Sequence, residues 1–242
     1  MKKYSKGKHC IILIFFLAVS VFTLAGCQPI SQSEAADDQG LQVTVSILPQ
    51  AYFVERIASD LVEINVMVEP GEEAHTYEPK PEQMKSLNAS QIFFSIGVEY
   101  ETSWIPRFED VNPEMRIVDT SAGIQRIELS ESDAHEEVLE HEDDDHADGL
   151  DPHVWLAPDN GKIIAENILD ALKELAPDQA DLFQGNYDLL IDDIDALDNQ
   201  IESTLSGLES RRFMVFHPSW GYFAEQYNLE QLPVQVGGQD PS

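Results

Sequence analysis

The sequence predicts an α/β protein made of two βα lobes with parallel sheets, joined by one long helix. Three observations predict this fold: strands and helices alternate between residues 41 and 119, one apolar stripe follows a helix of about 30 residues, and a new strand–helix–strand pattern begins near residue 210. Alternating strands and helices are typical of βαβ units with a parallel sheet. We expect the C-terminal lobe to be incomplete, because the stretch from Ser210 to Ser242 is too short to bury a core alone.

The N-terminal lobe, residues 41–177, is predicted from two periodicities. Residues 41–48 alternate apolar and polar side chains, as do residues 62–68, which is typical of half-buried strands. Residues 92–98 form an apolar run that suits a strand buried on both faces. A further short strand is expected at 116–119, and helical spacing is present at 49–61, 81–90 and 158–176.

The linking helix is predicted over residues 178–209. Its apolar residues step by three or four positions, which places them on one face, and the opposite face is acidic. A helix that spans two lobes of a monomer is the favoured interpretation, and a coiled-coil dimer is the competing one. The residues of the stripe are Phe183, Tyr187, Leu190, Ile194, Leu197, Ile201, Leu205 and Leu208. From Ser210 to residue 242 we expect only the start of the C-terminal lobe.

Residues 1–26 predict a secretory signal peptide. A basic start precedes an uncharged apolar segment, residues 11–25, which is shorter than the roughly 20 residues of a membrane span. The segment ends in the sequence LAGC, which looks like a bacterial lipobox, so Cys27 is expected to be acylated. Residues 27–40 would then be the acylated cysteine and a flexible tether. This arrangement predicts an extracytoplasmic protein, lipid-anchored on the periplasmic side or at the cell surface.

The charge balance is strongly acidic, with 45 Asp and Glu residues against 14 Lys and Arg residues and a formal charge of -31. Such a chain is repelled by nucleic acids and by anionic membrane surfaces, and it attracts cations. Its two cysteines, Cys10 and Cys27, both lie in the leader and at its end, so a disulfide framework is excluded.

Three histidines stand at positions where an α/β protein binds ligands. His75 and His217 each follow a predicted strand, and His153 precedes a helix. The carboxyl ends of strands form the ligand-binding edge of an open α/β sheet. Three imidazoles that converge from separate loops suit zinc better than magnesium or calcium. The histidines are too far apart along the chain for their spacing to form a motif on its own.

The segments around these histidines resemble the metal-specific solute-binding proteins of ABC importers, in the zinc/manganese class. The resemblance covers residues 41–242 and includes Pro70–Pro79, Asp151–Leu156 and Phe216–Phe223. An acidic histidine-containing loop, the long helix and the segment Gly238–Ser242 match as well.

The resemblance implies a rigid linking helix and metal ligation by His75, His153 and His217. Members of the family with His at the third position tend to be zinc-type, so Zn²⁺ is the expected ligand and Mn²⁺ the weaker candidate. The family takes its fourth ligand, an acidic residue or water, from a part of the C-terminal lobe that lies beyond residue 242. Glu73 or Glu72 could substitute for it.

The acidic loop, residues 128–150, holds three further histidines and no basic residue. It is open to two interpretations: a solvated linker, or a weak collector of zinc with His135, His141 and His146 as possible ligands.

The resemblance implies a protein that captures Zn²⁺ outside the membrane and delivers it to the membrane subunit of an ABC permease, without catalysis. The alternative is a surface adhesion or zinc-buffering lipoprotein without a cognate permease. A zinc hydrolase with Glu73 as base is disfavoured, because the sequence has no His-Glu-x-x-His motif.

Overall fold

The computed structural model describes residues 40–72, 74, 77–128 and 149–234. The predicted signal peptide, Cys27 and tether lie outside these residues. Glu73, His75 and the loop histidines His135, His141 and His146 also lie outside them. Across the described ranges, none of the helices combines the length and apolar character needed to span a membrane.

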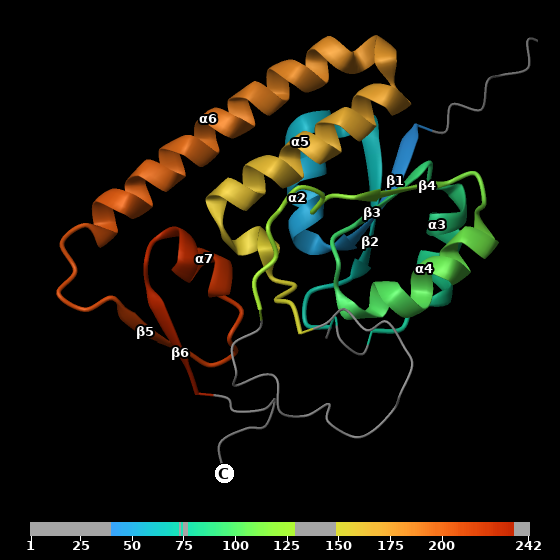
Figure 1. The fold of residues 1–242 in the computed structure, drawn as a ribbon. Helices are drawn as coiled ribbons and strands as arrows, with labels where there is room; N and C mark the ends of the chain where they lie inside the picture. Colours follow the sequence, from blue (N-terminus) through green and yellow to red (C-terminus); the bar gives the residue numbers. More distant parts are fainter. Residues whose placement is uncertain (1–39, 73, 75–76, 129–148, 235–242) are drawn as a thin grey trace, which may run out of the picture. The chain divides into compact units, whose positions relative to one another are not determined.

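A four-stranded parallel sheet forms the centre of the N-terminal part, in the order β2-β1-β3-β4 (Figure 1). Its strands are β1 (Leu41–Ile47), β2 (Val62–Val68), β3 (Ile92–Ser95) and β4 (Arg116–Asp119). The prediction of parallel βα units is therefore confirmed, and β2 and β4 have the predicted bounds. Strand β3 is shorter than predicted, because the chain turns at Gly97, whose φ is +90°.

The order of the strands creates a switch point between β1 and β3. The chain leaves β1 toward β2 on one side and then returns to β3 on the other side. Because parallel crossovers are right-handed, the helix after β1 covers one face and the helices after β2 and β3 cover the other. Ligands of open α/β sheets bind at the carboxyl ends of the strands beside such a switch point.

The helices around the sheet are α2 (Leu48–Ala58), α3 (Pro81–Ala89), α4 (Glu99–Val111), α5 (Pro158–Leu175) and α6 (Ala180–Leu205). Helices α2, α5 and α6 pack against one another. Fully buried side chains from the strands and helices form one core, including Phe93, Phe94 and Phe108. Helix α4 was not predicted; it contains Pro106, which interrupts the usual sequence signal of a helix.

The long helix α6 has 26 residues, which gives a length of about 39 Å, and it is shorter at both ends than the predicted segment. Its apolar stripe is buried over the first half only. Phe183 and Leu190 are inaccessible to solvent, whereas Leu197 is half-exposed and Leu208 lies beyond the end of the helix. Beyond Ile194, which is 9% exposed, the stripe therefore lies on a face that the described residues leave partly open to solvent.

The chain after α6 forms a small parallel strand–helix–strand unit, as predicted. It consists of β5 (Arg212–Val215), α7 (Gly221–Gln226) and β6 (Glu230–Pro233), with β5 paired to β6. The sequence pattern predicts a strand at 212–217, a helix at 218–227 and a strand from Gln231; β5 and α7 are shorter than these segments, and β6 begins one residue earlier. Met214 and Phe216 expose more than half of their surface, so this unit leaves much of its apolar surface uncovered.

A buried carboxyl group predicts how the stability of this fold depends on pH. Glu101 is 4% exposed, and its carboxylate accepts hydrogen bonds from the backbone N–H groups of Ile96 (3.0 Å) and Gly97 (2.8 Å). Burial raises the pKa of Glu101 to about 7 from its ordinary value of 4.5, despite these hydrogen bonds. Between these two values the folded chain holds a proton that the unfolded chain releases, so stability falls as pH rises.

Substitution of Glu101 by Gln should remove this dependence. Relative to the variant, the wild-type chain should lose on the order of 3 kcal/mol of unfolding free energy between pH 4.5 and pH 7.5. Urea unfolding of both metal-free proteins across this range measures the difference. Burial of the glutamine amide could lower the unfolding free energy of the variant, but by the same amount at every pH. If the plots of unfolding free energy against pH were parallel for the two proteins, the prediction would be wrong.

Candidate metal centre

The fold brings His153 and His217 together, although they lie far apart in the sequence. Their Nε2 atoms are 3.4 Å apart, and the rings meet at 74° with centroids 5.2 Å apart. Two nitrogens bound to one tetrahedral zinc at 2.0–2.1 Å are roughly 3.3–3.4 Å apart. The pair can therefore hold one ion between its Nε2 atoms with little rearrangement.

Asp151 orients the imidazole of His153. One carboxylate oxygen, Oδ1, lies 2.8 Å from His153 Nδ1 and also accepts the backbone N–H of His153 at 2.8 Å. Asp151 is 2% exposed, so water competes little for this contact. An Nδ1–H donated to a carboxylate leaves the Nε2 lone pair available for a metal ion. The contact therefore presents His153 in the form that binds metal.

The two histidines line a cavity of about 440 Å³ at the carboxyl ends of β1 and β2. His153 lies directly before the turn η2 (Val154–Leu156), and His217 lies in the segment after β5. Ala74 lines the same cavity and directly precedes His75, the third predicted ligand. Within the described ranges, the histidine pair is joined by no third His, Cys, Asp or Glu placed for a metal ion.

Glu72, a predicted substitute ligand, lines the same cavity but is engaged elsewhere. Its carboxylate lies 2.9 Å from Lys80 Nζ and accepts the backbone N–H of Glu69 at 3.1 Å. The hydrogen bond from Lys80 lowers the pKa of the Glu72 carboxyl group. A role as ligand would require Glu72 to leave Lys80.

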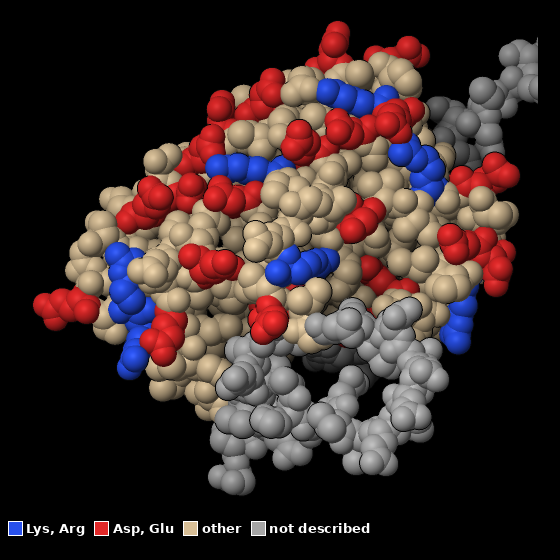
Figure 2. All heavy atoms as spheres, in the orientation of Figure 1, with Lys and Arg blue, Asp and Glu red and all other residues tan. Residues whose placement is uncertain are grey.

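The surface carries the acidic balance of the sequence. Figure 2 shows that acidic side chains predominate over basic ones on the face drawn, notably along α5 and α6. A surface of one sign raises the local concentration of counter-ions, which here are cations. This field favours the approach of a divalent metal ion.

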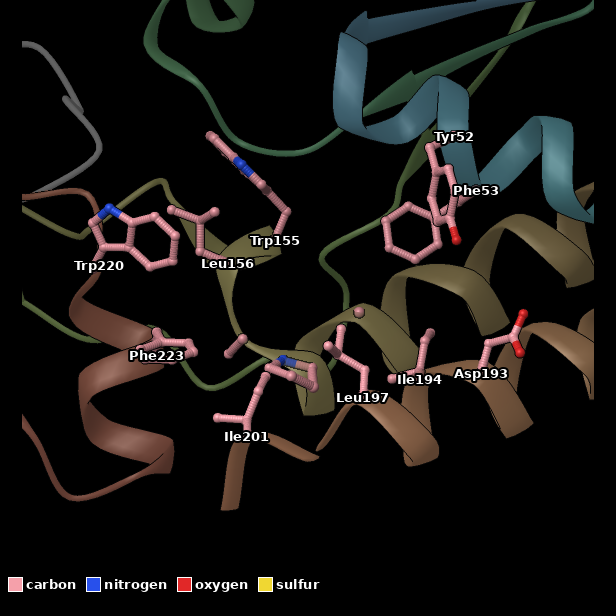
Figure 3. A pocket seen from close by; sticks show the side chains of 13 residues that line it. Tyr52, Phe53, Trp155, Leu156, Asp193, Ile194, Leu197, Ile201, Trp220 and Phe223 are labelled. Atoms are coloured by element: carbon pink, nitrogen blue, oxygen red, sulfur yellow. The ribbon is translucent and has the colours of Figure 1, made fainter. Parts of the chain in front are cut away.

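An apolar pocket of about 310 Å³ lies on the other side of η2, between α2, α6 and α7 (Figure 3). Trp155 and Trp220 line both this pocket and the cavity of the histidines. Asp193 contributes a carboxylate to its lining, but that carboxylate is paired with Arg56 at 2.7 Å. Because the described side chains of its walls are mostly apolar, this pocket is unsuited to a metal ion. Sequence reasoning missed the pocket, since its walls come from segments far apart in the chain.

A family model described as zinc-uptake complex component A, periplasmic, matches residues 43–242. The chain belongs to this family. Its resemblance to the metal-specific solute-binding proteins is thereby confirmed.

Individual relatives agree with the family. The chain is 28% identical to the high-affinity zinc uptake system protein ZnuA of Bacillus subtilis, over 91% of this chain and 70% of that protein. It is 27% identical to the manganese-binding lipoprotein MntA of Halalkalibacterium halodurans, over 91% and 69%. A crystal structure of ZnuA superposes with a TM-score of 0.72 and 36% identity, covering 84% of this chain and 73% of that one. The α/β architecture with its long helix is thus that of known members.

Proposed function

We propose that the chain captures Zn²⁺ outside the cytoplasmic membrane and delivers it to an ABC permease for uptake. The observation that carries this proposal is the pair of imidazoles with Nε2 atoms 3.4 Å apart, since this is the spacing of two ligands on one tetrahedral zinc. His75 would complete the set, because its neighbour Ala74 lines the same cavity. The protein would act as a carrier and not as an enzyme.

Zinc is the metal favoured over manganese in this proposal. Imidazole suits zinc, whereas manganese prefers carboxylate, carbonyl and water oxygens. Both described donors are imidazoles, and the Glu72 carboxylate is paired with Lys80. The names of the relatives do not decide between the two metals, because one is named for zinc and another for manganese. The preference for zinc therefore rests on the imidazole donors.

The remaining segments have roles in the same proposal. Residues 1–26 would be the signal peptide, and acylated Cys27 with residues 28–40 would tether the protein to the membrane. Residues 41–177 would form the N-terminal lobe, residues 178–209 the linking helix, and residues 210–242 the start of the C-terminal lobe. The acidic loop with His135, His141 and His146 would collect zinc weakly beside the central site.

Zinc uptake by cells tests the delivery step. Deletion of the gene should lower the initial rate of radioactive zinc uptake at limiting zinc, and the wild-type gene should restore it. The double variant His153→Ala/His217→Ala should not restore uptake, although it is present in equal amounts. Undiminished uptake after deletion would instead support a surface adhesion or zinc-buffering lipoprotein without a permease.

A further inference from the structure

The first turn of α7 contacts the segment that orients His153. The hydroxyl group of Tyr222 donates a hydrogen bond to the backbone carbonyl of Asp151 at 2.8 Å and accepts one from the backbone N–H of Ile127 at 3.3 Å. Tyr222 is 4% exposed, so the contact is shielded from water. Arg126 reaches the same carbonyl of Asp151 at 3.5 Å. The carbonyl is thus held from two sides.

Gly221 brings the helix backbone close to the same aspartate. A Cβ atom at this position would lie 2.5 Å from Asp151 Oδ2 and 3.0 Å from the Ile127 side chain. The Asp151 carboxylate cannot yield freely, because its other oxygen binds both His153 Nδ1 and the His153 backbone N–H. Glycine at position 221 is therefore what permits this close approach.

These contacts join the two segments that carry the imidazoles. Tyr222 lies shortly after His217 on the β5–α7–β6 unit, and Asp151 lies just before His153. The hydrogen bond from the Tyr222 hydroxyl group to the Asp151 carbonyl therefore lies close in sequence to one imidazole at each end, although the two residues are far apart in the chain. The contact therefore restrains the position of the unit that carries His217 relative to the segment that carries His153.

We infer that Tyr222 is a positioning residue that fixes the separation of His153 and His217 at the spacing of a tetrahedral ion, and that it thereby favours zinc over manganese. This inference rests on the proposed function. Zinc at structural sites is bound almost always by four ligands in a tetrahedron, whereas manganese suits six oxygen ligands in an octahedron. A pair held at 3.4 Å is prepared for the first geometry, and a loosened pair adapts to either.

Tyr222→Phe removes the hydroxyl group and keeps the ring. We expect this variant to bind zinc about 10-fold more weakly, at the low end of the effect of groups that orient metal ligands, while manganese affinity changes less. Cobalt provides a spectroscopic readout, because tetrahedral Co²⁺ absorbs visible light far more strongly than octahedral Co²⁺. The visible absorbance of the Co²⁺-loaded variant should be weaker than that of the wild type. Gly221→Ala should act in the same direction.

Tyr227→Phe is the matched control. Tyr227 is 7% exposed and lies at the end of the same helix, and its hydroxyl group donates to Asp198 on α6 at 2.6 Å. This variant loses a comparable hydroxyl contact between the same unit and the rest of the chain, so it should lose stability but keep the wild-type zinc-to-manganese ratio and cobalt spectrum.

Equal changes in metal preference for the two variants, or a Tyr222→Phe variant with wild-type zinc affinity and cobalt spectrum, would overturn the positioning role alone. A wild-type chain without a tight zinc site would overturn the proposed function and this role with it.

Discussion

Replacement of His153 by alanine should lower the zinc affinity of the chain on the order of 100-fold. The binding free energy of a structural zinc site with four ligands is about 10–16 kcal/mol, so one ligand contributes about 3 kcal/mol. A loss of about 3 kcal/mol lowers the affinity on the order of 100-fold. His153 is well placed to provide such a share, because Asp151 already fixes its orientation at 2.8 Å. A competition titration against a chromophoric chelator measures the change.

Asp151→Asn provides an intermediate variant for the same titration. The side chain keeps its volume, but an amide replaces the carboxylate that accepts the His153 Nδ1–H. Outer partners of metal ligands contribute about 10–100-fold in affinity, so this variant should bind zinc more weakly than the wild type and more tightly than His153→Ala. If the His153→Ala variant bound zinc with wild-type affinity, the zinc site would lie outside the cavity that His153 and His217 line.

Replacement of Leu190 by alanine should lower the unfolding free energy of the metal-free chain by about 2–5 kcal/mol. Leu190 is inaccessible to solvent in the half of α6 that packs with α2 and α5. The shortened side chain would leave a cavity in this contact, in addition to the loss of buried apolar surface. Chemical denaturation measures the loss.

The neighbouring Leu189 is the control for this prediction. It occupies the same helix but is 62% exposed, so Leu189→Ala should change the unfolding free energy by no more than about 0.5 kcal/mol. Similar losses in both variants would mean that α6 does not dock through the face that carries Leu190.

Strong periodicity made much of the N-terminal part predictable. The alternation in residues 62–68 marks β2 with its observed bounds, and the alternation from Leu41 marks β1 to within one residue. Helix α4 escaped prediction because Pro106 disfavours a helix interior, while the surrounding tertiary contacts still hold the segment helical. The second half of the α6 stripe also shows this limit: periodicity identifies an apolar face but does not say what covers Leu197.

The sequence named the histidines of the candidate site, but it did not predict that His153 and His217 lie side by side. His217 was singled out by its position after a strand and His153 by its position before a helix, and the resemblance supported both. Their separation along the chain, however, carries no information about their distance in space. The link from Tyr222 to Asp151 also joins distant parts of the sequence and ends on a backbone carbonyl, which leaves no pattern in a sequence. Contacts of this kind arise only once the fold places α7 beside η2.

Zinc capture by the paired imidazoles can be measured by competition titration of the wild-type chain with Zn²⁺ and Mn²⁺, with the triple variant His75→Ala/His153→Ala/His217→Ala measured beside it. We expect one tight zinc site that manganese does not displace and that disappears in the triple variant. Weak zinc binding that survives in the triple variant would contradict capture by these histidines, because the metal would then bind elsewhere on the chain.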